Sequence, residues 1–504
     1  MSSVSNEQKP AKKQQKKSSL NRKIITGILK SSLVITIVIG LLIAFVLTPW
    51  GTKTIINTSS SLVDELTIDY RSGGVGSELH LSSVKWKQLT SKVEIDNLRL
   101  SIKLSCVLKL ALCIDSMSTD KIVVQIQPTD PSTNAEPALS AISLPFHVYI
   151  DNINLNTFSL EVKDTASISW QKLTSKLDFY QRLRIEKMQL DGFNLTTFAT
   201  DTSQVATQAE PFDWARWEYQ PITLLPFILP IHFEVLAFNM SATSLQLARQ
   251  QEIKLQKVSF KAKGSKKRVQ LDELLVEHEQ GRLLATGNVQ LNGDFEHVFS
   301  VDANANWVEQ TPLKLTLRSS GNIHSLSTQV ELIETTSSTQ THTVNSQAKP
   351  LKLLMDLTAQ ASKATLPVTM RLGWSYLEWP LADPELTSES GLIDIKGDLN
   401  ALKMAIQTMV SGTNIPDTKI NLSAIAASTA QDKNVELNEL LLKTLDGQVL
   451  SKGKLTFSEY IDWQGSSAIS HLDPSVLWPQ LVADINGEVL TQANNSQGIW
   501  KAKL

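Results

Sequence analysis

The side chains of this sequence that could support catalysis or metal binding are scattered. The eight histidines stand singly, and only His278 lies between two carboxylates, Glu277 and Glu279. That triplet falls between two alternating runs, which is typical of a solvated turn rather than of a metal site. The chain also lacks a phosphate-binding loop, a nucleophile elbow, a zinc-protease helix and a dinucleotide fingerprint. We therefore expect a protein that is not an enzyme, with no catalytic residue, no metal ligand and no cofactor.

The two cysteines, Cys106 and Cys113, could react with each other. Seven steps along a straight strand span about 23 Å, whereas the Cα atoms of a disulfide lie within ~7 Å. A bridge therefore requires Val107 to Leu112 to fold back as a turn or a short helix. Two buried free thiols are the alternative. We expect the disulfide, since a location outside the cytoplasm permits it.

Charge is concentrated only at the N-terminus. The whole chain has 48 Lys and Arg against 50 Asp and Glu, so nothing favours nucleic acid as a partner. Residues 1–23 form a basic tail, and residues 24–50 are mostly apolar, with no charge from Ser31 to Thr52. A helix over those 22 residues would span roughly 33 Å, enough for a bilayer core.

Residues 24–50 are accordingly predicted to be a single transmembrane anchor. Lys23 and Trp50 would lie at its two membrane interfaces, and Pro49 and Gly51 would end the helix. A cleaved signal peptide is the competing interpretation, but no A-x-A-like site follows the apolar run. The basic tail should stay in the cytoplasm, which places the bulk of the chain on the far side of the membrane.

After the anchor, alternating apolar and polar residues indicate short strands rather than helices. Ile122, Val124 and Ile126 share one side of such a strand, as do Leu313, Leu315 and Leu317 of another. Polar segments near 200–209 and 335–347 interrupt the pattern as loops. The predicted fold class is mainly β, with one transmembrane helix followed by a long, repetitive, curved sheet.

A repeated hexapeptide is the strongest internal signal. It occurs at Ile95–Leu100, Ile150–Leu155, Leu190–Leu195, Leu271–Val276 and Leu437–Leu442, with apolar residues at its first, fourth and sixth positions. A flat strand would point the first and fourth residues to opposite faces, so a bulge or bend at the second and third positions, where an Asp or Asn is followed by Asn, Gly or Glu, should reset the register. The later apolar residues should then face a common groove: Leu98, Leu100, Ile153, Leu155, Phe193, Leu195, Leu274 and Leu440.

A longer internal repeat contains two pairs of glycines. Val269–Leu291 aligns without gaps on Val435–Phe457, so that Gly281 meets Gly447 and Gly287 meets Gly453. We expect all four glycines in hairpin turns, where a positive φ is often needed.

Several segments together resemble a known family. They are the anchor, the Trp86–Lys92 segment and its repeat at Trp170–Lys176, the Cys106–Cys113 pair, Leu144–Val148 and Tyr376–Pro380. These are similar to the N-terminal part of the TamB family, inner-membrane subunits of the translocation and assembly module, within the AsmA-like, bridge-like lipid-transfer superfamily. The resemblance implies an open, taco-like β groove, phospholipid as cargo and a TamA-like outer-membrane barrel as partner. The family's C-terminal contact domain has no counterpart here, so a truncated chain is expected.

These expectations give four regions and two functions. The regions are the basic tail 1–23, the anchor 24–50, a membrane-proximal β region 51–127 and an elongated β groove 128–504. The first function is a periplasmic conduit that shields phospholipid acyl chains between the inner and outer membranes. The second is an assembly factor for outer-membrane barrels and autotransporters, with strand edges that pair with client strands. A closed β-helix with a filled core remains the structural alternative to the open groove.

Overall fold

The computed structural model describes residues 37–127 except 39 and 43, 146–198, 218–248, 251–308, 311–335, 350–380, 384–413, 415–428, 433–457, 461–494 and 498–503. The basic tail, Lys23 and the first part of the predicted anchor lie outside these ranges, as do both predicted polar loops apart from Thr335. Within the ranges, no helix has the length and apolar character needed to cross a bilayer.

Helix α2 (Pro49–Leu62) follows directly on the helical residues 44–47. The Gly51 N–H donates a hydrogen bond of 3.1 Å to Oγ1 of Thr48, the N-cap, and Pro49 takes the first helical position, where no amide is needed. Pro49 thus interrupts the helical run, but the expectation that Gly51 ends the helix is wrong. A Cβ on Gly51 would lie 2.0 Å from the Phe45 carbonyl oxygen, so this closely packed position requires glycine.

The rest of the described chain forms one 26-stranded sheet with two short 3-10 helices. The first strands and helix are β1 (Leu66–Ser72), β2 (Glu78–Lys87), β3 (Ser91–Ile102), η1 (Leu104–Lys109), β4 (Ala111–Thr119), β5 (Lys121–Ile126), β6 (His147–Val162), β7 (Ala166–Phe179), β8 (Arg182–Asp191) and β9 (Asn194–Thr197). The central strands are β10 (His232–Gln246), β11 (Ile253–Ser265), β12 (Arg268–His278), β13 (Gly281–Gln290), β14 (His297–Val308), β15 (Thr311–Asn322), β16 (Ser325–Glu334), β17 (Lys352–Ala359) and β18 (Val368–Trp379). The last elements are β19 (Leu386–Asp398), β20 (Ala401–Gly412), β21 (Ile415–Ser428), β22 (Lys433–Thr444), β23 (Gly447–Phe457), β24 (Ile461–Leu472), η2 (Pro474–Val476), β25 (Ile485–Ala493) and β26 (Gly498–Lys503).

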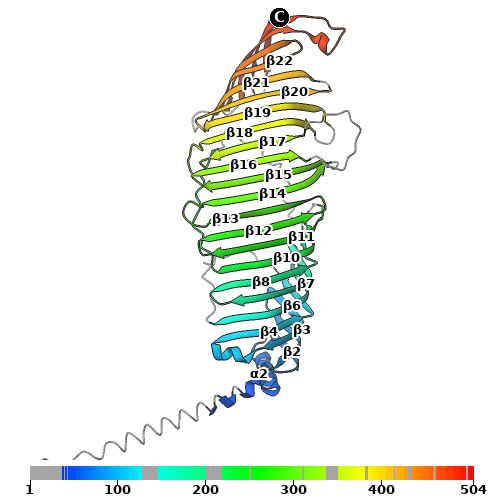
Figure 1. Cartoon of the computed structure of the whole chain (residues 1–504), viewed down its shortest axis with the longest axis vertical. Coiled ribbons are helices and arrows are strands. Elements are labelled where there is room, and N and C mark those ends of the chain that lie inside the picture. Colours follow the sequence, from blue (N-terminus) through cyan, green and yellow to red (C-terminus); the bar gives the residue numbers. More distant parts are fainter. Residues whose placement is uncertain are drawn as a thin grey trace, which may run out of the picture.

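The sheet is an open, largely antiparallel meander, whose strands stack like rungs along the long axis in Figure 1. From β10 to β26 each strand pairs antiparallel with the next. Among the described strands, parallel pairs occur only where β4 and β5 meet β6 and where β8 and β9 meet β10. In the described part of the chain β1 and β26 do not pair with each other, so the sheet has two free ends. This topology differs from the parallel coil of a β-helix.

Each copy of the hexapeptide coincides with an irregularity in its strand. The ladder slips between Ile150 and Ile153, between Leu271 and Leu274, and between Leu437 and Leu440. In the Leu190–Leu195 copy, Gly192 has φ +66° and separates β8 from β9. In the Ile95–Leu100 copy, Asn97 has φ +52° without a slip against β2. The predicted resetting of the register is thus confirmed by ladder slips in three copies and by the break at Gly192 in a fourth, whereas the Ile95–Leu100 copy keeps its register against β2.

The glycine prediction for the longer repeat is wrong for two of the four positions. Gly281 and Gly447 begin β13 and β23, beside the turns. Gly287 and Gly453 lie inside those strands, where an aromatic ring from the neighbouring strand covers each one. A Cβ would come within 2.3 Å of the Phe299 ring at Gly287 and within 2.4 Å of the Trp463 ring at Gly453. These two positions need glycine because a side chain would collide with the ring, and not because of turn geometry.

Candidate functional site

One continuous row of side chains crosses the sheet on a single face. Residues directly opposite each other on paired strands share a face, so the row can be followed from strand to strand. In the N-terminal half it runs through Leu79, Leu100, Met117, Ile153, Ser175, Met188, Phe238 and Phe260. It continues through Leu274, Ala285, Val301, Leu317, Val330, Met355, Leu372, Ile393, Ile406, Leu422 and Leu440. We call this set the apolar row.

The apolar row contains one polar residue, Ser175, and no charge over 19 strands from β2 to β22. At about 4.8 Å between strands it extends for roughly 85 Å. We call the face that carries it the inner face. Four of the residues predicted to face a common groove, Leu100, Ile153, Leu274 and Leu440, belong to the row itself.

The other four predicted residues lie on the same face beside the row. Leu98 is opposite Leu81, which is 7% exposed. Leu155 and Phe193 pack against the buried cluster Ile153, Leu173 and Leu190. Leu195 is opposite Ile168, two residues before Trp170, and Trp170 packs on that cluster.

The inner face is the concave side of the sheet in this N-terminal part. Trp170 lies beyond the bend at Gly192 and still contacts the cluster of Ile153, Leu173 and Leu190. Its ring stacks on Phe158 with centroids 3.7 Å apart. Side chains from the two sides of the bend can meet in this way only if the strands fold toward the apolar face. The hexapeptide irregularities therefore curve the sheet around its apolar residues.

The inner face is shielded only in part. Eleven hydrophobic side chains are buried in the described part of the chain, including Leu79, Ile153 and Ala424 of the inner face. The remaining residues of the apolar row are half-buried. A closed core of this length would bury most of them, as in ordinary close-packed interiors. An apolar surface of this extent that stays accessible to water marks a binding surface.

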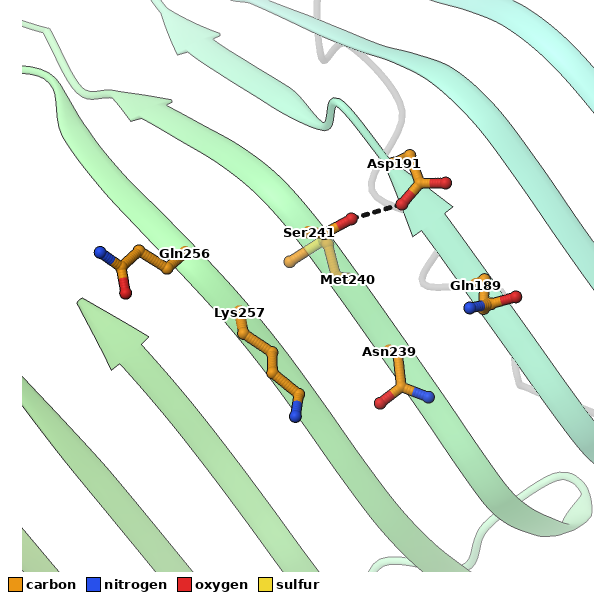
Figure 2. Close-up of a pocket in the computed structure, with 7 residues that line it drawn as sticks. All are labelled: Gln189, Asp191, Asn239, Met240, Ser241, Gln256 and Lys257. Carbon is orange, nitrogen blue, oxygen red and sulfur yellow. Dashed lines mark hydrogen bonds between the residues drawn. The ribbon is translucent and has the colours of Figure 1, made fainter. Parts of the chain in front are cut away.

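The opposite, outer face is polar from β6 to β11 and mixed beyond them, where Leu275 and Leu284 follow Ser259 and precede Asp302. Asn154, Thr174, Gln189, Asn239 and Ser259 form a row of opposite residues on five adjacent strands. Figure 2 shows Gln189, Asn239 and Lys257 around a shallow hollow of about 290 Å³, where Ser241 donates a hydrogen bond to Asp191. The two faces thus differ in chemistry, which is what alternation predicts for a sheet with one face in water.

Charged groups gather on the outer side at the bulge of β6. Hydrogen bonds from the Tyr149 hydroxyl and the Lys176 ammonium to its carboxylate lower the pKa of Asp151. The pKa of Lys176 is raised by Tyr149, Glu186 and Asp151, and its ammonium lies 5.4 Å from the centre of the Tyr149 ring. Both groups are therefore ionised at neutral pH and keep this face hydrated. The described residues contain no cluster of His, Cys, Asp and Glu that could hold a metal.

Cys106 and Cys113 are joined by a disulfide, with Cα atoms 5.8 Å apart. The chain between them folds back through η1, and Leu110, with φ +55°, turns it into β4. Trp50 lies in α2, is 72% exposed and packs edge-on against Phe45 with ring centroids 5.6 Å apart. Its exposure is compatible with a place at a membrane interface, which stays a prediction.

Two tryptophans of the inner face, whose rings fill the space above neighbouring glycines, were not identified in the sequence analysis. The rings of Trp374 and Trp463 lie over Gly391 and over Gly453 and Gly465, and their Nε1–H groups donate to Ser388 Oγ and Thr491 Oγ1, each at 2.9 Å. The indole nitrogens are thereby satisfied within the sheet, so each ring presents only carbon to the face. The signal was available as glycines inside alternating runs, but it is readable only once the strand pairing is known.

Two comparisons with known proteins match this architecture. The family model described as TamB, N-terminal domain, matches residues 38–504. The translocation and assembly module subunit TamB of Haemophilus influenzae (strain ATCC 51907 / DSM 11121 / KW20 / Rd) is 21% identical over 493 residues, which cover 90% of this chain and 36% of that protein. The chain thus spans about a third of that relative's length. No solved structure matches the chain.

Proposed function

Because the chain belongs to the TamB family, through its N-terminal domain, we propose that it is an envelope protein whose inner face shields phospholipid acyl chains between two membranes. The proposal includes the predicted inner-membrane anchor, a cytoplasmic N-terminus and a periplasmic sheet. The observation that carries it is the apolar row, which runs through 19 strands without a charge. Together with the curvature of the sheet it forms what we call the groove.

The energetics of lipid transfer explain why such a groove is useful. Exposing one CH₂ group costs roughly 0.8 kcal/mol, so a 16-carbon chain in water costs about 13 kcal/mol. That barrier prevents free passage of lipid through an aqueous space. Acyl chains lying on the half-exposed inner face would be removed from water, while head groups could stay hydrated at its rim. A row without charged side chains also avoids the cost of desolvating a charge along the route.

Photo-crosslinking in cells tests the proposal. A photoreactive residue at Leu155 or Phe193, on the inner face, should capture phospholipid. The same residue at Arg99 or Asn194, which are exposed, should capture little. Asn154 is a poor control, because its Oδ1 is buried without a hydrogen-bond partner in the described structure. Equal lipid capture at all four positions would contradict a lipid-shielding groove.

A second candidate function is assembly of outer-membrane proteins, suggested by the relative's name, translocation and assembly module subunit, and by a free strand edge. The outer edge of β1 has no partner strand among the described residues, so it could pair with a client strand. A TamA-like outer-membrane protein belongs to this candidate, and no residue of this chain is assigned to that contact. Crosslinkers at Thr67 and Asp69, two exposed residues of β1, test it: capture of barrel proteins there, without lipid at Leu155, would favour assembly over transport.

A further inference from the structure

The disulfide loop carries apolar side chains that the fold leaves uncovered. Val107 is 56% exposed and Leu110 is 83% exposed, although both belong to the compact η1 segment and its C-cap. Exposing two such side chains next to each other is unfavourable in water. Contact with something outside the described chain would remove them from water.

The backbone of the loop is held by a covalent bridge and by main-chain hydrogen bonds. The Cys106–Cys113 disulfide closes the loop. At the base of the loop the Lys103 N–H donates a hydrogen bond of 2.8 Å to the Cys113 carbonyl oxygen. Leu110 has a φ of +55°, a conformation that a bulky residue seldom adopts. Its N–H donates a hydrogen bond of 3.0 Å to the Val107 carbonyl oxygen. The constraint fixes Leu110 as the projecting tip of the loop.

The loop lies beside another exposed apolar element. The Gly76 N–H donates a hydrogen bond of 3.3 Å to the Leu47 carbonyl oxygen. A Cβ on Gly76 would lie 3.6 Å from Cδ1 of Leu104, the first residue of η1. Gly76 therefore connects η1 to the helical residues before Thr48. There Leu41 and Leu42 are 66% and 58% exposed. Figure 1 shows α2 at the same end of the sheet as β2, β3 and β4.

We propose that the disulfide loop is a membrane-docking element, which inserts Val107 and Leu110 into the surface of a phospholipid bilayer. The bilayer is favoured over a protein partner because the neighbouring helical residues present a run of exposed aliphatic side chains without charge. The inference rests on the proposed inner-membrane location but not on lipid passage along the inner face. Docking would hold the first strands of the groove against the membrane from which lipid enters.

The charges of the loop agree with this orientation. Lys103 is paired with Asp115, which raises the pKa of the lysine. Lys109 is exposed and makes no ion pair within the described residues. If Leu110 is inserted, the neighbouring Lys109 lies at the level of the lipid head groups, where its ammonium can bind their phosphates.

A matched pair of photoreactive sites in the full chain tests the docking. One replaces Leu110, and the other replaces Val482, which is also 83% exposed but lies between η2 and β25 near the far end of the sheet. We expect phospholipid adducts at Leu110 to exceed those at Val482 by about tenfold or more, as burial of one leucine predicts. Equal yields, or adducts with protein instead of lipid at Leu110, would overturn the proposal.

Two variants separate docking from lipid passage. With Phe193→Arg, adducts at Leu155 should fall while those at Leu110 stay unchanged; a parallel fall would show that lipid reaches Leu110 through the groove and would overturn docking. With Cys106→Ser and Cys113→Ser together, the Leu110 yield should drop several-fold because the loop is no longer held closed. An unchanged yield there would show that the disulfide does not position the loop, contrary to the proposal.

Discussion

Phe193 and Ile153 lie on the same face but in different surroundings, so a charge at each should have different effects. Phe193 is half-buried, and an arginine there could reach water at the mouth of an open groove. Phe193→Arg should therefore keep the circular dichroism spectrum of the sheet while lipid capture is lost. Ile153 is 9% exposed within its cluster, and Ile153→Arg should unfold the neighbouring strands. Unfolding of both variants to the same extent would contradict an open inner face.

The disulfide is a second prediction about single residues. Thiol labelling of denatured, unreduced protein should find no free cysteine, whereas quantitative labelling of both would contradict the bridge. Replacing both cysteines by serine should reduce the local free energy of unfolding by about 2 to 3 kcal/mol, the usual effect of a short closed loop. Hydrogen exchange of η1 and β4 should report that loss, with exchange in β20 as an unaffected reference.

At the scale of the strands, we predict that two glycines of the sheet differ in how well they tolerate a side chain. A Cβ at Gly391 would meet the Trp374 ring at 1.9 Å, whereas one at Gly373 finds its nearest neighbour at 3.8 Å. Gly391→Ala should thus cost about 1 to 3 kcal/mol as the indole is displaced, and Gly373→Ala should change stability little. Urea unfolding of the two variants compares them directly. Equal stability of the two would mean that the ring does not lie over Gly391.

Sequence patterns predicted these elements to different degrees, for physical reasons. The strand irregularities at the hexapeptides could be predicted because their apolar spacing fits neither a flat strand nor a helix. A bulge between the first and fourth positions resolves the conflict, as between Ile150 and Ile153. Helix α2 was missed because its polar run Asn57–Ser61 lacks an apolar stripe and its stability depends on Thr48 and on packing at Gly51. The parallel pairs of β6 and β10 depend on where long connections return, which local spacing does not encode.

For the whole molecule, the orientation of the chain is a separate prediction. The basic tail and the uncharged Ser31–Thr52 span predict that the sheet lies on the periplasmic side. A reporter that is active only in the periplasm, fused after Thr67, should therefore be active, and the mature protein should keep its N-terminus. Activity of a cytoplasm-only reporter at the same position, or cleavage after the apolar run, would refute the predicted orientation.

A conduit also requires that the apolar row work as one continuous path. Leu317 lies midway along it, and Ser320 is an exposed residue on the outer side of the same strand, β15. Leu317→Arg places a charge in the path, and Ser320→Arg places the same charge in water. The two variants therefore differ only in the face that carries the arginine.

The most direct test measures lipid adducts on the two sides of that block, with photoreactive residues at Leu100 and at Leu440 in the Leu317→Arg chain. A continuous path predicts that adducts persist at the end where lipid enters and fall at least severalfold at the other end, while Ser320→Arg leaves both unchanged. Equal, undiminished adducts at Leu100 and Leu440 in the Leu317→Arg chain would contradict passage of lipid along the inner face.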